Sequence, residues 1–515
     1  MSGNAAEYFV DRHLAEGRSE KIAFREASGA KRHLSYGALA DQSNCIASAY
    51  AAQGIAREER VACILLDEIE YPVIFWGSLK CGVVPVALNT LLSTDVYETI
   101  LRDSRASCLF VSHALLPVVM PALTDNPFIR TIVVVGGDAP ESTSHTAMSY
   151  EAFMKEATPR AAIEADEDEC AFWLYSSGST GRPKGVRHVH GSLKATADTY
   201  GAQVLGIKER DTIYSAAKIF FAYGLGNAMT FPMSVGATTI LFAGRPTPDV
   251  AVDIIEKERP TIFCGVPTLY AATVAFMEAK GVPEHALRLC ISAGEALPAD
   301  IGNKWQDMTG SEILDGVGST EMLHIFLSNR PGEVLYGTSG QAVPGYDLRC
   351  VDETGQEVAK GSGAVGELLV RGASAADGYW NQRQKSRTTF EGEWTRTGDK
   401  YERAEDGRYI YCGRTDDMFK VSGIWVSPFE VEQALVAHPA ILEAAVVAAA
   451  DAEGLEKPKA FIVMKDAKES LDQDVLKEFV KEKIGKWKYP RWVEIVEDLP
   501  KTATGKIQRF MLRDA

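Results

Sequence analysis

The sequence has little that points to a metal site, a nucleic-acid interface or a disulfide framework. Its nine cysteines occur singly, without a C-x-x-C pair, and their number is odd. A zinc site is therefore not expected, and reduced thiols in a cytoplasmic protein are the simplest interpretation. The chain carries 54 Lys and Arg against 70 Asp and Glu, a formal net charge of −16. That balance argues against nucleic acid as a partner, although a local positive cluster can still bind a small anion.

Long apolar segments are scarce as well. The longest apolar run, residues 71–88, is interrupted by Lys80 and Pro85, so we do not expect it to span a membrane. The first dozen residues are acidic and polar, which is not the pattern of a signal peptide. These features predict a cytoplasmic protein with no membrane partner. We expect a monomer or a homodimer.

The 515 residues are enough for two or three domains. Short apolar runs such as RVACILLD and GVVPVALN alternate with amphipathic stretches, and the alternation returns after residue 200 in TTILFA, TIFCGV and LRLCISAGE. This pattern predicts βαβ units and parallel sheets covered by helices. From about residue 330, glycine-rich turns predict a β-rich subdomain. The last segment, of about 100 residues, predicts a small domain of its own, with helices from Pro428 and over 470–484.

The segment 175–193, YSSGSTGRPKGVRHVHGSL, is rich in glycine and hydroxyl side chains between an expected strand and an expected helix from Ser192. Glycine lets backbone N–H groups converge on an anion, Ser and Thr add donors, and Lys184 adds a positive charge. The Walker A pattern does not fit, because Pro183 precedes this lysine and Gly185 follows it. The segment therefore predicts a phosphate-binding loop unlike that of P-loop NTPases, rather than a flexible linker.

Four further segments follow this loop in order: SAGEALP (292–298), DGVGSTEM (315–322), the Gly-, Asp- and Arg-rich 395–423, and PKTATGKIQR (500–509). Each alone is typical of a turn, and DGVGSTEM is expected to follow a strand that ends at residue 314. In this order and spacing they resemble the adenylate-forming ANL superfamily of acyl-CoA synthetases, peptide-synthetase adenylation domains and firefly luciferases. The resemblance covers essentially the whole chain.

The resemblance implies an α/β fold. A large N-terminal domain, residues 1–415, would contain two αβ subdomains and a β-subdomain. A small mobile α+β C-terminal domain, residues 416–515, would rotate on a hinge near Asp416. Rotation would let one active site serve two reactions, with Ser422 and Gly423 lining the channel for the pantetheine arm of coenzyme A.

The implied chemistry is the conversion of a carboxylate to an acyl-adenylate, from which a thiol displaces AMP. The carboxylate must approach an anionic phosphate, and at about 4 Å two unit charges repel by roughly 4 kcal/mol at an effective dielectric of 20. Positive groups remove that obstacle. The resemblance assigns this role to Lys506, with Thr320 and Glu321 as further catalytic residues. It also implies ATP, Mg²⁺ and coenzyme A, with Glu321 and Thr180 as metal ligands.

The remaining site residues also come from the resemblance. Those expected around ATP or AMP are Ser176, Ser177, Gly178, Ser179, Thr180, Gly181 and Lys184 on the phosphates, Thr320 on the α-phosphate, Gly294, Glu295, Ala296, Asp315 and Gly316 along the adenine, and Asp399 and Arg414 at the ribose. Segments 218–239 and 318–333 are similar to the benzoate-CoA ligase branch, which includes hydroxy- and aminobenzoate ligases. By that similarity the residues around a small planar acid are Phe220, Ala222, Tyr223, Gly318, His324 and Ile325.

The leading hypothesis is an ATP-dependent aryl-CoA ligase acting on benzoate or a hydroxybenzoate. A short-chain aliphatic or heteroaromatic acyl-CoA synthetase is the alternative. A stand-alone adenylation domain and a non-catalytic ligand-binding protein are further alternatives. For Tyr223 and Ile325 the competing interpretation is ordinary core packing, and for His324 it is a structural hydrogen bond.

Overall fold

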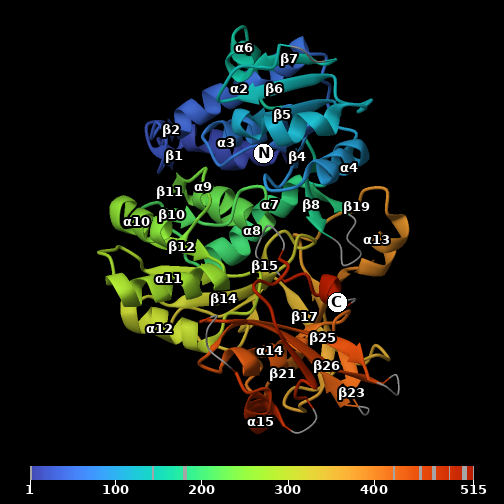
Figure 1. Cartoon of the computed structure of the whole chain (residues 1–515). Helices are drawn as coiled ribbons and strands as arrows, with labels where there is room; N and C mark the ends of the chain where they lie inside the picture. The colour runs from blue at the N-terminus through green and yellow to red at the C-terminus, as the bar shows by residue number, and fades with distance from the viewer. Residues whose placement is uncertain are drawn as a thin grey trace. The chain divides into compact units, whose positions relative to one another are not determined.

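The computed structural model describes residues 3–141, 144–177, 183–421, 424–451, 455–466, 471–485, 488–501 and 507–513 (Figure 1). The chain forms two compact units. The first comprises Met1–Tyr336, Gly340–Asp347 and Val370–Thr395, and the second comprises Gly337–Ser339, Leu348–Leu369 and Arg396–Ala515. The predicted domain boundary at residue 416 lies inside the second unit. The division into two units therefore does not test the predicted hinge near Asp416, which stays a prediction.

The first unit contains an eight-stranded sheet in the order β19-β9-β8-β4-β3-β5-β6-β7. Pairing is parallel from β8 to β7, whereas β9 and β19 are antiparallel at one edge. Strands β3, β5 and β6 are almost continuously buried, as expected for a parallel sheet covered on both faces. The strands are β3 (Arg60–Ile64), β4 (Val84–Ala87), β5 (Cys108–Ser112), β6 (Thr131–Val135), β7 (Thr146–Ser149), β8 (Cys170–Ser177), β9 (Pro183–Val189) and β19 (Gly378–Tyr379).

Helices pack against this sheet through apolar and aromatic side chains. One cluster packs the sheet against α4, α5 and η3. On α2, β5 and α6, the rings of Tyr50, Phe110 and Phe153 pack together with centroids 5.4–6.0 Å apart. The helical segments before β8 are η1 (Glu7–Asp11), α1 (Arg12–Ala15), α2 (Tyr36–Ala52), α3 (Glu70–Lys80), α4 (Thr94–Ser104), η2 (His113–Leu115), α5 (Leu116–Val119), η3 (Met120–Leu123) and α6 (Tyr150–Met154).

The first unit also contains a nine-stranded sheet in the order β16-β15-β14-β13-β12-β10-β11-β1-β2. It is parallel from β14 to β1 and antiparallel at both edges. The strands are β1 (Ile22–Glu26), β2 (His33–Ser35), β10 (Thr212–Ser215), β11 (Thr238–Leu241), β12 (Ile262–Gly265), β13 (Leu289–Ser292), β14 (Ile313–Gly318), β15 (Ile325–Ser328) and β16 (Gln341–Ala342).

One face of this second sheet carries a core formed with α10, α11 and α12, which lie along one flank in Figure 1. Two short helices, η5 and α9, pack against β10 and β11. The helical segments are α7 (His190–Thr196), η4 (Ala197–Val204), α8 (Ala222–Leu225), η5 (Gly226–Thr230), α9 (Phe231–Val235), α10 (Pro248–Glu258), α11 (Pro267–Lys280), α12 (Ala299–Thr309) and α13 (Arg383–Thr389).

The second unit contains most of a sheet in the order β17-β18-β21-β20, with β22 beside β21, followed by a three-stranded sheet β25-β26-β27. Helices α14 and α15 share a core with the three-stranded sheet. The elements are β17 (Asp347–Val351), β18 (Val365–Arg371), β20 (Phe390–Glu391), β21 (Trp394–Arg403), β22 (Tyr409–Arg414), β23 (Phe419–Val421), β24 (Ile424–Val426), α14 (Pro428–Val436), β25 (Ile441–Ala450), β26 (Glu456–Met464), α15 (Gln473–Ile484), β27 (Trp492–Ile495) and η6 (Arg509–Leu512).

The predicted α/β class is confirmed, and two local expectations need correction. Helix α7 begins at His190, two residues before the predicted start at Ser192. The residues from Asp315 to Gly318 lie within β14 instead of after it, because β15 pairs antiparallel with them: Gly316 pairs with Ser328. Among the described residues, we find no helix that is both long enough and apolar enough to cross a bilayer.

Candidate active site

Strands β8 and β9, which flank the predicted phosphate-binding loop in the sequence, pair with each other. Ser176, at the end of β8, pairs in register with Lys184 near the start of β9. The hydroxyl oxygen of Ser176 is buried and has no hydrogen-bond partner among the residues that the structure describes. Ser177 pairs through its backbone with Pro183. The predicted phosphate contacts Gly178, Ser179, Thr180 and Gly181 lie outside the described residues.

Lys184 and Glu321, both predicted site residues, meet although they are 137 positions apart. The Lys184 Nζ lies 3.4 Å from Glu321 Oε1, and the Tyr379 hydroxyl donates to the same oxygen at 2.8 Å. Burial raises the pKa of Glu321, but the charge of Lys184 and the bond from Tyr379 outweigh it and lower the pKa overall. The carboxylate is therefore ionised at neutral pH and offers hard oxygen atoms beside a positive charge.

Tyr379 was not predicted from the sequence. Its ring lies 4.7 Å from the Lys184 Nζ, measured to the centroid, and its hydroxyl is 3.5 Å from the same nitrogen. It is the second residue of β19, which pairs with β9. The local sequence does not single out Tyr379 as a site residue, because a tyrosine in a glycine-rich β-segment has no distinctive pattern.

His188 fixes the backbone of the predicted catalytic pair, and it too was not predicted. Its Nε2 lies 2.8 Å from the carbonyl oxygen of Thr320, and its ring stacks on Phe172 at 5.2 Å. Burial lowers the pKa of His188 to about 4. The neutral ring therefore donates from Nε2, since a carbonyl oxygen only accepts. Lys184 and His188 are four residues apart on β9, so their side chains share one face.

The residues predicted around the adenine lie within β14 and in the segment that follows β13. The Asp315 side chain accepts from the backbone N–H of Leu297 through Oδ2 at 3.3 Å, which joins segment 292–298 to β14. Its other oxygen, Oδ1, is buried with no partner in the described part of the chain. Burial raises the pKa of Asp315 to about 8, so this carboxyl keeps its proton at neutral pH. Gly294 has φ +101°, which only glycine adopts easily.

The two residues predicted at the ribose are neighbours within the second unit. Asp399 on β21 and Arg414 on β22 are paired in register, and Arg414 Nη1 donates to Asp399 Oδ1 at 2.9 Å. Arg414 also donates to the carbonyl of Thr397 at 3.1 Å. Asp399 therefore lies in a strand held by a salt bridge, and not in an isolated turn.

Two arginines near the C-terminus hold the predicted hinge segment. Arg513 donates to the carbonyl of Asp416 at 3.0 Å and to Asp417 Oδ1 at 2.6 Å. Arg509 lies 3.7 Å from the Asp417 carboxylate and forms two hydrogen bonds with Glu432, at 2.9 and 2.7 Å. The predicted catalytic Lys506 and the predicted channel residues Ser422 and Gly423 lie outside the described residues.

Two predicted acyl residues, His324 and Tyr223, are in contact, and His324 is 2 % exposed. Its Nε2 lies 3.2 Å from the Tyr223 carbonyl, and its ring centroid is 4.5 Å from that of Phe231, 5.4 Å from Tyr200 and 5.7 Å from Tyr223. Burial lowers the pKa of His324 to about 3, so the ring is neutral. The Tyr223 hydroxyl lies 3.1 Å from the Gly265 carbonyl and 3.0 Å from that of Ile291.

The other predicted acyl residues lie on the same two chain segments as Tyr223 and His324. Gly318 pairs in register with Ile325, and a Cβ at position 318 would lie 2.5 Å from the His324 carbonyl. Phe220 is buried, and its ring packs against Phe221 at 4.4 Å. Ala222 begins α8, immediately before Tyr223. The structure thus groups all six residues on two segments, and their contact with an acid stays a prediction.

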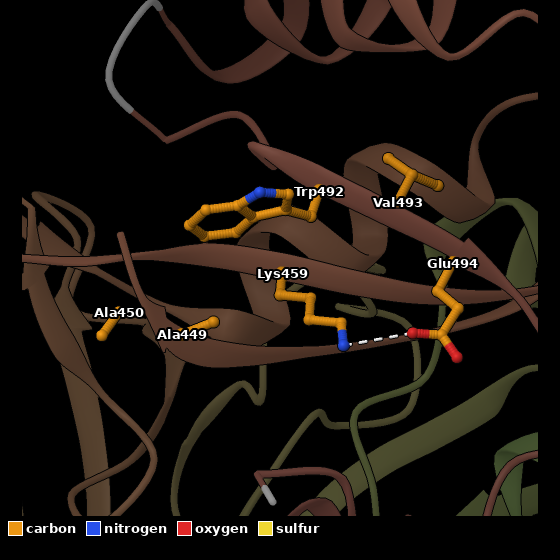
Figure 2. Close-up of a pocket in the computed structure, with 6 residues that line it drawn as sticks. All are labelled: Ala449, Ala450, Lys459, Trp492, Val493 and Glu494. Atoms are coloured by element: carbon orange, nitrogen blue, oxygen red, sulfur yellow. Dashed lines mark ion pairs between the residues drawn. The ribbon is translucent and has the colours of Figure 1, made fainter. Parts of the chain in front are cut away.

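A cavity of about 410 Å³ opens on the three-stranded sheet of the second unit (Figure 2). Within it, Lys459 Nζ lies 3.1 Å from Glu494 Oε2, below the indole of Trp492. Its lining residues are Ala449, Ala450, Lys459, Trp492, Val493 and Glu494. These do not include any predicted site residue, and we assign the cavity no part in the chemistry.

Residues 11–380 match the protein family described as AMP-binding enzyme, and residues 430–506 match the AMP-binding enzyme C-terminal domain. The chain belongs to the AMP-binding enzyme family.

Relatives of this AMP-binding enzyme include ligases for aromatic acids. It is 52% identical to a 4-hydroxybenzoate-CoA/benzoate-CoA ligase of Rhodopseudomonas palustris, over 99% of this chain and 94% of that one. It is 51% identical to a benzoate-CoA ligase of Thauera aromatica, over 99% and 96% of the two chains. A solved benzoate CoA ligase structure from Burkholderia xenovorans superimposes with a TM-score of 0.89, at 46% identity over 99% of both chains.

These similarities confirm the predicted superfamily and the predicted enzyme class, an AMP-forming acyl-CoA ligase. Use of ATP and coenzyme A follows from this class. The individual site residues of this AMP-binding enzyme, the Mg²⁺ ion and the oligomeric state stay predictions.

Proposed function

We propose that this enzyme is an ATP-dependent aryl-CoA ligase that converts benzoate or a hydroxybenzoate to its CoA thioester, through an acyl-adenylate, with release of AMP and pyrophosphate. The observation that carries the proposal is the buried cluster of Tyr223, His324 and neighbouring aromatic rings. It occurs in a chain about half identical to ligases named for benzoate. Aromatic side chains suit a flat, short acid better than a long flexible one.

The protonation state of His324 favours a substrate acid whose aromatic ring carries a hydrogen-bond donor. The Nε2 of this neutral imidazole must donate to the Tyr223 carbonyl, so Nδ1 is left as an acceptor. Nδ1 is buried, and no described residue bonds to it. Leaving a buried acceptor unpaired typically costs about 1–3 kcal/mol. A ring hydroxyl or amino group that reached Nδ1 would satisfy it, which favours a hydroxybenzoate or aminobenzoate alongside benzoate.

The charges around Lys184 suit the phosphates of ATP. We propose that Lys184 contacts them together with Ser176 and the loop between β8 and β9. The ionised Glu321 supplies the oxygen that Mg²⁺ prefers, and this ion usually takes only one or two protein ligands. The residues therefore fit the ion, although the described residues contain no group of three or more His, Cys, Asp or Glu placed to hold a metal. Bound beside Glu321 and Thr180, the ion would neutralise charge on the departing pyrophosphate.

Two steps require two arrangements of the C-terminal residues in this proposal. Lys506 spans the acid and the α-phosphate while the adenylate forms, and then leaves before the thiol attacks. Asp416 is the hinge of that movement, and Ser422 and Gly423 then border the pantetheine arm. These four assignments rest on the sequence motifs. A cytoplasmic location and a monomeric or homodimeric state stay predictions with them.

The test is a panel of acids assayed with ATP and coenzyme A by AMP release. The panel contains benzoate, 2-, 3- and 4-hydroxybenzoate, 2-aminobenzoate, furoate, butyrate and octanoate. We expect benzoate or a monosubstituted benzoate to have the highest kcat/KM. If butyrate or octanoate exceeds every aromatic acid tenfold, about 1.4 kcal/mol of transition-state preference, the aryl assignment is wrong. A preference for butyrate would then favour the short-chain aliphatic alternative, and the ligase class would stand in either case.

A further inference from the structure

Asp67 is a buried carboxylate that the reaction as proposed does not use. It follows β3 in the eight-stranded sheet and is 3 % exposed. Its Oδ1 accepts from the backbone N–H of Ile219, at 3.3 Å, in the segment that follows β10 of the nine-stranded sheet. Burying a carboxylate is costly unless hydrogen bonds or opposite charges compensate it. This contact between the two sheets therefore needs an explanation.

Lys218, the residue before Ile219, supplies a positive charge whose attraction lowers the pKa of Asp67. Its Nζ donates to the carbonyl of Phe242, just after β11, and lies 5.2 Å from the centroid of the Phe242 ring. Burial raises the pKa of Asp67 to about 6, and the attraction of Lys218 opposes that rise. Burial likewise lowers the pKa of Lys218, and Asp67 opposes it. The two groups thus hold together the ends of β3, β10 and β11.

The segment that Asp67 holds leads directly to the acyl residues. The backbone N–H of Phe221 donates to the Lys218 carbonyl at 3.0 Å, and α8 begins at Ala222. Within α8, a Cβ at Gly224 would lie 2.0 Å from the Lys218 carbonyl oxygen, so the two backbones are in close contact. A shift of Lys218 would therefore move α8, and with it the ring of Tyr223.

We propose that Asp67 is a positioning residue for the acyl site: through Ile219 and Lys218 it sets the place of α8 and Tyr223. This inference rests on the proposed function, because it takes Tyr223 to border the acid. It predicts that Asp67 affects recognition of the acid and leaves recognition of ATP unchanged.

The test compares Asp67→Ala and Asp67→Asn with Asp211→Ala. Asp211 is a matched control, because it is 2 % exposed, precedes the same strand β10, and pairs with Arg288 at 2.7 Å. Each variant is assayed for the KM of the acid, the KM of ATP, kcat and the melting temperature. The acid is whichever one the wild type prefers, so a wrong aromatic assignment changes the acid and leaves the comparison intact.

We expect Asp67→Ala to raise the KM of the acid at least tenfold and to leave that of ATP within twofold. Asp67→Asn keeps an oxygen that accepts from Ile219, so it should restore the KM of the acid to within about threefold of wild type. Asp211→Ala should lower the melting temperature and leave the KM of the acid within twofold. If Asp67→Ala does not fold, Lys218→Met, which removes the countercharge and keeps most of the stem, should give the same separation of the two KM values.

Three results would overturn the inference. They are an unchanged KM for the acid in the Asp67→Ala or Lys218→Met variant, an equal rise in both KM values, and the same separation in Asp211→Ala. A different result, a wild-type enzyme that is inactive with every acid, would overturn the proposed function and with it the inference that rests on it.

Discussion

Replacing Gly226 with alanine tests whether His324 borders the acid. Gly226 has helical backbone angles, φ −64° and ψ −60°, so alanine introduces no backbone strain there. Inside a helix it would even be favoured by about 1 kcal/mol. The new Cβ, however, would lie 2.3 Å from His324 Cδ2, 2.6 Å from His324 Nε2 and 2.9 Å from Phe231 Cζ. The imidazole must move away, and its bond to the Tyr223 carbonyl moves with it.

The size of the effect follows from the cost of overpacking a buried site, typically about 1–3 kcal/mol. If that cost appears in the transition state for formation of the acyl-adenylate, kcat/KM for the aromatic acid falls roughly 5- to 150-fold. The KM of ATP should stay within twofold, because the residues around Lys184 and Glu321 do not contact Gly226 in any described hydrogen bond or ring contact. The loss should be larger for a hydroxybenzoate than for benzoate, since the hydroxyl would lose its acceptor.

The assay measures kcat/KM for benzoate and the three hydroxybenzoates at saturating ATP and coenzyme A. Gly191→Ala in α7 is the matched control, because a Cβ there meets its nearest atom, the Glu167 carbonyl oxygen, at an ordinary 3.4 Å. The kcat/KM of the Gly191→Ala variant should stay within twofold of wild type for each acid. If Gly226→Ala melts normally and keeps kcat/KM within twofold for every aromatic acid, His324 does not border the acid and the acyl-site assignment is wrong.

Three further variants test the nucleotide and hinge assignments. Lys506→Ala should slow adenylate formation about 100-fold or more, yet spare thioester formation from supplied acyl-adenylate; equal losses in the two assays would contradict its assignment. Asp416→Pro, which restricts φ, should retain pyrophosphate exchange and make little thioester, and an unchanged ratio would argue against a hinge. Burial raises the pKa of Asp315 from 3.8 to about 8, so the native state keeps a proton that the unfolded chain loses, and stability falls as pH rises through that interval. Asp315→Asn should therefore lose less melting temperature than wild type between about pH 6 and pH 9, and equal losses would contradict this reasoning.

Much of the proposed nucleotide site could be assigned from the sequence, because its residues lie in short motifs. Lys184 stands in a glycine- and hydroxyl-rich segment, and Glu321 lies in the DGVGSTEM motif, so each could be proposed without knowledge of its partner. The alternation of apolar runs predicted the parallel sheets for a similar reason, since it is a local property of the chain. Strand β14 extends further than expected because its last residues pair with β15, and that pairing is not visible in β14 itself.

The supporting residues could not be predicted, because their roles come from tertiary contacts. Tyr379 is 58 positions from Glu321, and His188 is 132 positions from Thr320. Asp67 is one of 70 acidic residues in the sequence, and only its burial distinguishes it from those on the surface. No spacing rule connects such pairs, since the fold alone brings them together.

The shared face of Lys184 and His188 has a practical consequence for preparing this enzyme. Side chains alternate along a strand, so a one-residue slip of β9 against β8 would turn both residues to the opposite face. Molecules refolded with that slip would keep their helices and other sheets and would resemble native protein by circular dichroism. They would nevertheless lack the lysine beside Glu321 and the support under Thr320. Activity and nucleotide bound, each per mole of total protein, are therefore better criteria of successful refolding than secondary-structure content.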